Sequence, residues 1–93
     1  MLAELLVIGT SGLAKEAAQL ARDIDPEGRR WSRISYVSER RGTERPKLPF
    51  GELRYADEDL PGLSGPFDVV IGIGLPEVRR RVAERLGKCP QCR

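Results

Sequence analysis

Histidine is absent from this chain of 93 residues, cysteine occurs only twice, and aromatic residues make up 5% of it. Without histidine, the commonest general base near neutral pH is missing, and a catalytic triad of the usual serine or cysteine kind cannot be built. The longest apolar run holds only a few residues, far fewer than the roughly 20 that cross a bilayer. The sequence therefore excludes a histidine-based catalytic centre and a membrane span.

The N-terminus also lacks the features of a secretory signal. No basic residue precedes the short apolar run that follows Glu4, and this run passes directly into a glycine-rich turn. We therefore expect a cytoplasmic protein.

The length allows one small hydrophobic core. Hydrophobic residues form 40% of the chain and charged residues 32%, which is the balance of an ordinary soluble domain. We expect a single domain over residues 1–87 and a short tail over residues 88–93.

Charge is distributed unevenly along the chain. The 16 basic and 14 acidic residues give a net charge of +2, but residues 79–93 hold six basic residues against one acid. Residues 52–77 hold one basic residue against six acids. A basic end can attract nucleic acid, but the aromatic residues are scattered and do not interleave with it, so the pattern does not favour nucleic-acid binding.

The two cysteines, Cys89 and Cys92, form a Cys-x-x-Cys pair in the tail. Tetrahedral zinc needs four ligands, so this pair is at most half of a metal site, and another subunit or a missing segment would have to complete it. The simpler interpretation is a tail with free thiols. We expect no resident metal or other cofactor.

The first half of the chain alternates between strand and helix patterns. An apolar run at 4–8 predicts a strand, and Gly9-Thr10-Ser11-Gly12 predicts a turn into a helix that ends near Pro26. Helical spacing predicts that this helix buries the face formed by Leu13, Ala17, Leu20, Ala21 and Ile24.

A second strand is predicted at 33–37, a short strand at 52–55 and a helical turn within 56–63. Residues 68–74 are apolar on both alternating faces, which predicts a central strand buried on both sides. Pro76 opens a second helix, which Gly87 closes and whose predicted core stripe is Val78, Val82, Ala83 and Leu86. This order predicts an α/β fold, a small Rossmann-like parallel sheet flanked by helices.

Ligands of open α/β sheets bind beyond the carboxyl ends of the strands, where the strand order reverses. If the first strand is central, this crevice lies between the glycine-rich segments 9–12 and 72–74. Glycines let backbone amides approach a ligand, and the helix beginning near Gly12 offers free N–H groups to an anion. The candidate binding residues at this edge are Gly9, Thr10, Ser11, Gly12, Lys15, Glu39, Gly72, Ile73, Gly74 and Arg79.

Each of these candidates also has a purely structural interpretation. The Gly-x-x-Gly turn lacks the third glycine of the dinucleotide fingerprint and can be a structural turn. Glu39 suits a ribose hydroxyl, but it can equally pair with Arg40 or Arg41 in a solvated loop. Lys15 and Arg79 can meet phosphate charge or lie on the surface. No Walker phosphate loop is present, so nucleotide hydrolysis is not expected, and no catalytic residues are assigned.

Together, these segments resemble a known family. The turn 9–12 with Leu13-Ala14-Lys15-Glu16, the strand 34–39, Pro49-Phe50-Gly51, and the segment 69–74 with Arg79 are similar to the N-terminal domain of PglD-type bacterial sugar acetyltransferases, which include sialic-acid O-acetyltransferases. The resemblance covers roughly residues 2–87.

The resemblance implies a nucleotide-sugar site, commonly for a UDP-amino sugar, formed by Gly9 to Gly12, Ser38, Glu39, Gly72 and Gly74. In this family a left-handed β-helix domain follows, binds acetyl-CoA and supplies the catalytic histidine. These 93 residues contain no hexapeptide repeats, so we expect no acetyl transfer by this chain alone and a separate or missing β-helix domain as its partner.

The sequence departs from the family pattern at several polar positions. Leu13 stands where the family often has histidine, Ser38 and Glu39 stand where it has paired aspartates, and Leu75-Pro76 replaces a frequent Asp-Asn pair. Two other functions therefore stay open. One is a protein-interaction or zinc-linked module, including a homo-oligomer, and the other is a dinucleotide- or CoA-binding domain.

Overall fold

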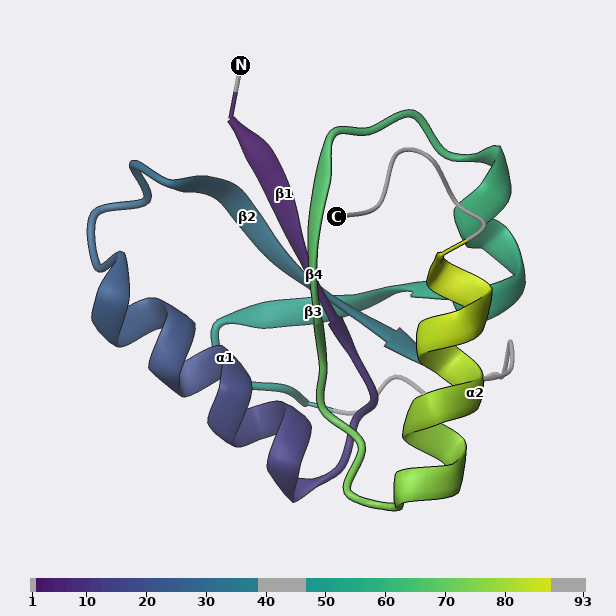
Figure 1. The fold of residues 1–93 in the computed structure, drawn as a ribbon. Helices are drawn as coiled ribbons and strands as arrows, with labels where there is room; N and C mark the ends of the chain where they lie inside the picture. Colours follow the sequence, from purple (N-terminus) through teal and green to yellow (C-terminus); the bar gives the residue numbers. More distant parts are fainter. Residues whose placement is uncertain (1, 39–46, 88–93) are drawn as a thin grey trace.

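The computed structural model describes residues 2–38 and 47–87 as a small parallel α/β domain (Figure 1). The order of its elements agrees with the pattern predicted from the sequence. The elements are β1 (Ala3–Ile8), α1 (Gly12–Ile24), β2 (Trp31–Ser38), β3 (Gly51–Ala56), the 3₁₀ helix η1 (Asp57–Gly62), β4 (Phe67–Ile71) and α2 (Pro76–Leu86).

The four strands form one parallel sheet in the order β3-β2-β1-β4. The chain moves outward from β1 to β2 and β3, then returns to place β4 on the other side of β1. Strand β1 is therefore interior, as the sequence analysis required for a crevice at its carboxyl end. The predicted Rossmann-like fold class is confirmed.

Strand β4 is not the central, doubly buried strand that its apolar sequence predicted. Within the described residues it pairs with β1 alone, and Asp68 to Ile71 are only half-buried. The prediction was wrong because an apolar run shows that a strand has contacts on both faces but does not show how many neighbours it has in the sheet.

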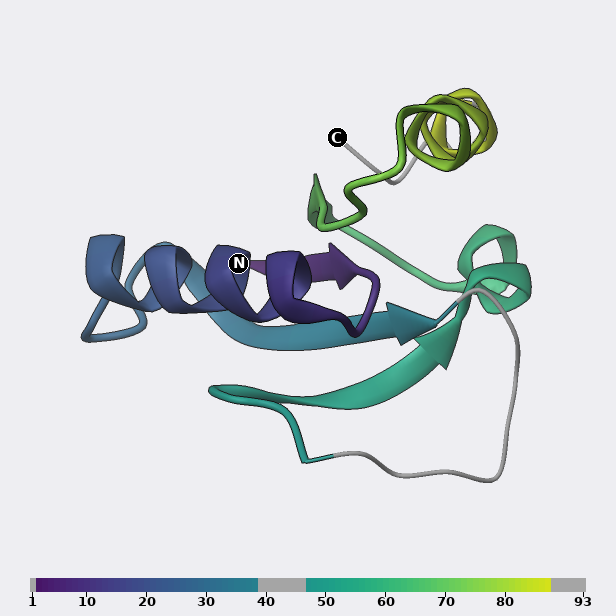
Figure 2. The same ribbon diagram turned by 90° about the horizontal axis from the view of Figure 1, so that it is seen from below.

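Helices α1 and α2 lie on opposite faces of the sheet (Figures 1 and 2). On the α1 side, alternate residues of β1 and β2 pack with alanines of the helix; this cluster holds Leu5, Val7, Ala14, Ala18, Ala21, Ile34 and Tyr36. On the α2 side, the other alternate residues pack with α2 and η1; this cluster holds Leu6, Ile8, Val37, Leu60, Phe67 and Val82. The two-residue period of the strands thus divides the core into two layers.

Helix α1 buries a face that only partly overlaps the predicted one: Ala21 is buried and Ala17 half-buried as predicted, but Leu13 is 42% exposed. Ala14, Ala18 and Ala21 are buried, whereas Leu20 is 62% exposed and Ile24 is 57% exposed. Only small side chains allow the helix backbone to approach the sheet this closely. The larger apolar residues therefore remain beside the contact and form an exposed stripe.

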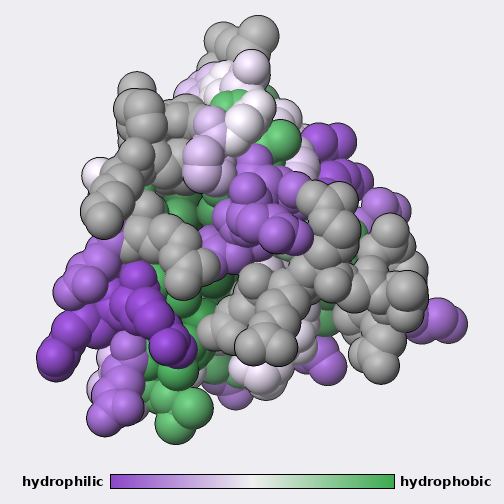
Figure 3. Space-filling model, turned by 90° about the vertical axis from the view of Figure 1, so that its right-hand side faces the viewer, coloured by the Kyte–Doolittle hydropathy of each residue, from purple (hydrophilic) through white to green (hydrophobic). Residues whose placement is uncertain are grey.

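Helix α2 follows its predicted stripe with one exception. Val82 is buried and Val78 and Leu86 are half-buried, but Ala83 is exposed. The helix contacts the sheet along a narrow line near β4, so Ala83 lies beyond the contact. On the side of the molecule that carries α2, hydrophilic residues dominate and apolar surface shows between them (Figure 3).

A polar network joins three strands on the α2 side of the sheet. Its centre is the carboxylate of Glu4 on β1, whose side chain is only 11% exposed. This carboxylate accepts hydrogen bonds from Arg33 Nε at 3.0 Å, from the Tyr55 hydroxyl at 3.1 Å and from the Ser35 hydroxyl. The hydrogen bond to Glu4, together with one to Tyr55, raises the pKa of Arg33 above its ordinary value.

The end of α1 is closed by Asp25. Its carboxylate accepts hydrogen bonds from the backbone N–H groups of Arg29, Arg30 and Trp31, at 2.8 to 3.1 Å. Burial acts to raise the pKa of Asp25, but these three donors outweigh it and lower the pKa below 3.8. The turn from α1 to β2 is therefore built around an ionised carboxylate.

Candidate functional site

The carboxyl ends of three strands meet at the glycine-rich edge of the sheet. The N–H of Gly9, after β1, donates to the carbonyl of Val37 on β2 at 2.8 Å. The N–H of Gly72, after β4, donates to the carbonyl of Ile8 at 2.8 Å. The two glycine-rich segments therefore follow neighbouring strands and lie side by side at one edge of the sheet, where the sequence analysis expected them if the first strand was central.

Two of the glycines at this edge are required by the fold itself. Gly9 has a φ of +112°, and a Cβ atom there would lie 2.8 Å from the carbonyl oxygen of Gly72. A Cβ atom on Gly72 would lie 2.5 Å from the Cα atom of Ala14. The structural interpretation of the glycine pattern is correct for these two positions, because the first turn of α1 packs directly on the end of β4.

Gly12 differs from both. A Cβ atom at Gly12 would have no atom within 4 Å, and the residue is exposed at the first position of α1. Ser11 is the N-cap residue, but its side chain makes no capping hydrogen bond, and no acidic residue occupies the first turn. Among the described residues, no side chain caps the N–H groups of Gly12 and Leu13 at the start of α1, whereas the amide of Ala14 is packed against Gly72.

The remaining predicted residues differ in how much of them is exposed at this edge. Lys15 is exposed in the first turn of α1, and Thr10 is half-buried in the turn before it. Gly74 is exposed, and a Cβ atom there would only touch Leu13, at 4.0 Å. Ile73 packs against the hydrophobic cluster on the α2 side, so its side chain belongs to the core.

Predicted residues from β2 and α2 lie around the same edge. Ser38 is the last residue of β2 and is half-buried, directly after the Val37 carbonyl that Gly9 contacts. Arg79 is exposed in the first turn of α2. Glu39, Cys89 and Cys92 lie outside the described residues, as does the tail over 88–93.

Two apolar residues that the sequence analysis noted as departures from the family pattern, but did not assign to the site, border this edge. Leu13 is 42% exposed and Leu75 is 67% exposed, on the helix and the loop that flank the glycines. Both occupy positions where the resemblance led to an expectation of polar residues. They give the edge an apolar border beside the free N–H groups of α1.

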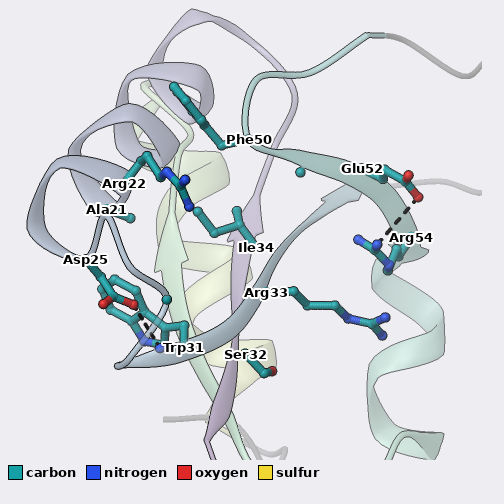
Figure 4. A pocket seen from close by; sticks show the side chains of 12 residues that line it. Ala21, Arg22, Asp25, Trp31, Ser32, Arg33, Ile34, Phe50, Glu52 and Arg54 are labelled. Atoms are coloured by element: carbon teal, nitrogen blue, oxygen red, sulfur yellow. Dashed lines mark hydrogen bonds and ion pairs between the residues drawn. The ribbon is translucent and has the colours of Figure 1, made fainter.

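Two pockets of the structure lie away from this edge. One lies between the last turn of α1 and the beginnings of β2 and β3, and its lining includes Arg22, Trp31, Phe50 and Arg54 (Figure 4). The other is a mainly apolar groove between α1 and β4, which includes Leu20, Ile24 and Val70. Neither was predicted, because the residues of each come from segments far apart in the sequence.

The described residues hold no group of three or more side chains suited to bind a metal ion. Among the helices of the same part of the chain, none has the length and apolar character of a membrane span.

The parallel sheet, the reversal of strand order at β1 and the glycine turn into α1 define a Rossmann-like α/β domain. Residues 4–86 match the model of the PglD N-terminal domain family, and the chain belongs to this family. The resemblance seen in the sequence is thereby confirmed over nearly the whole chain. Searches among curated proteins and among solved structures gave no match.

Proposed function

We propose that this domain binds a nucleotide sugar, of the UDP-sugar class, at the glycine-rich edge where β1, β4 and the N-terminus of α1 meet. Membership in the PglD N-terminal domain family supports this function. The observation that carries the proposal is the start of α1 at Gly12, which no side chain of the described residues caps and where a Cβ atom would meet no atom within 4 Å. Such a turn suits a diphosphate, since its N–H groups and the helix dipole both favour negative charge.

The surrounding residues are consistent with the other parts of such a ligand. Lys15 adds a positive charge one turn into α1. Leu13 and Leu75 offer apolar surface to the face of a base or of a sugar ring. The hydroxyl groups of Thr10 and Ser11 and of Ser38 at the end of β2 are hydrogen-bonding groups for the ribose or the sugar.

In this proposal the chain binds and orients the sugar nucleotide and does not transfer the acetyl group. The transfer step would need an acetyl-CoA-binding β-helix domain, from another part of the protein or a separate chain. We therefore expect the domain alone to bind without turnover.

A thermal-shift screen tests the proposal directly. The ligands are UDP, UDP-GlcNAc, UDP-amino sugars, CMP-sialic acid, NAD, NADP and CoA. A ligand at about 100 times its dissociation constant stabilises the folded state by about 2.7 kcal/mol, which raises the Tm of a domain of this size by roughly 10 °C or more. We expect this shift from the UDP compounds.

Two substitutions at Gly12 separate the site from the fold. Gly12→Glu places a carboxylate at the start of α1, which favours the free helix by about 0.3–1 kcal/mol but repels a phosphate. Gly12→Gln fills nearly the same space without the charge. We expect Gly12→Glu to keep or raise the Tm of the free protein and to abolish the shift with UDP compounds, with a smaller loss for Gly12→Gln.

The same screen addresses the other functions left open by the sequence. A preference for NAD, NADP or CoA would replace the UDP-sugar proposal with a dinucleotide- or CoA-binding domain. If no nucleotide changes the Tm, the nucleotide-sugar function is refuted. Zinc analysis and light scattering would then test the interaction or zinc-linked module.

A further inference from the structure

The pocket between the last turn of α1 and the beginnings of β2 and β3 has no part in the proposed nucleotide-sugar site. Because the strands are parallel, their beginnings lie at the opposite end of the sheet from the glycine-rich edge. The pocket has a volume of about 320 Å³, at the lower end of the range of small-molecule sites. We propose that it is a second binding site, for a small planar ring that carries one phosphate or carboxylate group.

Phe50 provides a surface for the ring. Its φ is +63°, a left-handed conformation that costs a bulky residue about 1–2 kcal/mol, and its side chain is 47% exposed. A glycine would adopt the same conformation without strain. A bulky aromatic residue is therefore held in a strained and exposed position, which is a common property of functional residues.

The residues on both sides of Phe50 fix this conformation. The hydroxyl of the fully buried Tyr36 donates to the carbonyl of Pro49 at 2.8 Å, and burial raises the pKa of this hydroxyl above 10.0. On the other side, a Cβ atom at Gly51 would collide with the carbonyl oxygen of Ile34. Phe50 thus stands between two anchored positions, and its ring is presented at the border of the pocket (Figure 4).

Arg22 provides the positive charge. It lies in the last turn of α1 and is exposed, with no hydrogen bond or ion pair to the described residues. In Figure 4 its guanidinium group points from α1 across the pocket toward β2, and the Phe50 side chain reaches back toward α1 from the start of β3. An aromatic face and a guanidinium group that has no partner among residues 2–38 and 47–87 therefore converge on one space.

The acidic residues of the pocket are already satisfied within the chain. The Asp25 carboxylate accepts its three backbone N–H groups. Glu52, whose side chain is 77% exposed, forms an ion pair with Arg54 at 3.5 Å. Neither acid therefore neutralises the charge of Arg22. This charge also lies near the carboxyl end of α1, where it offsets the partial negative charge of the helix dipole.

These features together select the ligand class. A flat ring stacks on Phe50, and a phosphate or carboxylate accepts the paired hydrogen bonds that a guanidinium group offers. The volume suits one ring with one anionic group and is small for a dinucleotide.

The test is an NMR titration of the whole ¹⁵N-labelled chain with phenyl phosphate. We expect the largest shifts at the backbone amides of Phe50 and Gly51. Inorganic phosphate and phenol, each lacking half of the ligand, should bind at least about tenfold more weakly. Benzoate in a parallel titration distinguishes a carboxylate ligand from a phosphate ligand.

Three variants separate binding from folding. Phe50→Gly removes the ring and relieves the strained backbone, so the variant should fold with an unchanged or higher Tm. Arg22→Gln removes the charge from an exposed position. We expect each to weaken phenyl phosphate binding at least about tenfold, whereas Arg81→Gln, at an exposed position of helix α2, should leave it unchanged.

The proposal is overturned if phenyl phosphate at about 10 mM shifts none of the pocket resonances, or if Phe50→Gly and Arg22→Gln bind it as the unchanged chain does. Failure here is distinguishable from failure of the nucleotide-sugar proposal. A UDP-sugar is expected to shift the amides of residues 9–12, at the other end of the sheet.

Discussion

Gly72 and Ala14 lie so close together that a Cβ atom on Gly72 would be 2.5 Å from the Cα atom of Ala14. One residue follows the edge strand β4 and the other belongs to the first turn of α1. Their contact holds the start of α1, which directly follows the glycine-rich segment 9–12, against the glycine-rich segment 72–74. The position of the α1 N-terminus, and with it the candidate phosphate site, depends on this contact.

Gly72→Ala should therefore destabilise the domain. The added methyl group has to move the first turn of α1 away from β4, which we expect to lower the free energy of unfolding by about 1–3 kcal/mol. Urea denaturation followed by circular dichroism measures this change. Gly62→Ala is the matched control, because a Cβ atom at Gly62 meets no atom within 4 Å. Equal stability of the two variants would contradict the close packing of α1 on β4.

The Glu4 network should contribute measurably to stability. Glu4→Gln leaves Arg33 without its carboxylate, and we expect a loss of about 1–3 kcal/mol in the free energy of unfolding. Glu27→Gln, at an exposed ion pair with Arg29, should change it by less than about 0.5 kcal/mol.

A double-mutant cycle with Tyr55→Phe tests whether the Glu4 network acts as a unit. Tyr55 donates to both carboxylate oxygens of Glu4, so the two losses should not add, and the coupling should be about 0.5 kcal/mol or more. Simple additivity would show that the contacts are energetically independent.

Asp25 should make the stability sensitive to acid. Its pKa is lowered in the folded chain, so its contribution is fully present above the unfolded pKa near 3.8 and is lost as the pH falls through the lower folded value. Asp25→Asn should lower the Tm at pH 7, and the difference from the unchanged chain should shrink toward pH 2 to 3. Thermal denaturation at several pH values measures this, and a difference that stays constant over the whole range would rule out the ionised cap.

Substitutions on the two faces of α1 should differ in their effect on stability. Ala18→Leu enlarges a fully buried side chain against the sheet, and we expect it to destabilise the domain by about 1–3 kcal/mol. Leu20→Gln changes a side chain that is 62% exposed, and we expect a change of less than about 0.5 kcal/mol. The reverse order of effects would support the face that helical spacing predicted and contradict the observed packing.

The order of strands and helices follows from local patterns. Apolar runs, the Gly9 to Gly12 turn and Pro76 each act over a few neighbouring residues, so they can be recognised without knowledge of the fold. The same holds for the family that residues 4–86 match. The interior position of β1 was only assumed in the sequence analysis, and the order of the strands in the sheet established it.

The tertiary structure alone decided which surfaces these elements share. Helical spacing could not show that α1 buries Ala14 and Ala18 in place of its larger apolar residues, because the choice depends on the room left by Gly72. The Glu4 network joins Glu4 to Arg33 and Tyr55, which lie 29 and 51 positions further along the chain. The pocket at Phe50 is lined by residues of α1, β2 and β3. These features arise from contacts between segments distant in the sequence, whose geometry is set by how the helices and strands pack.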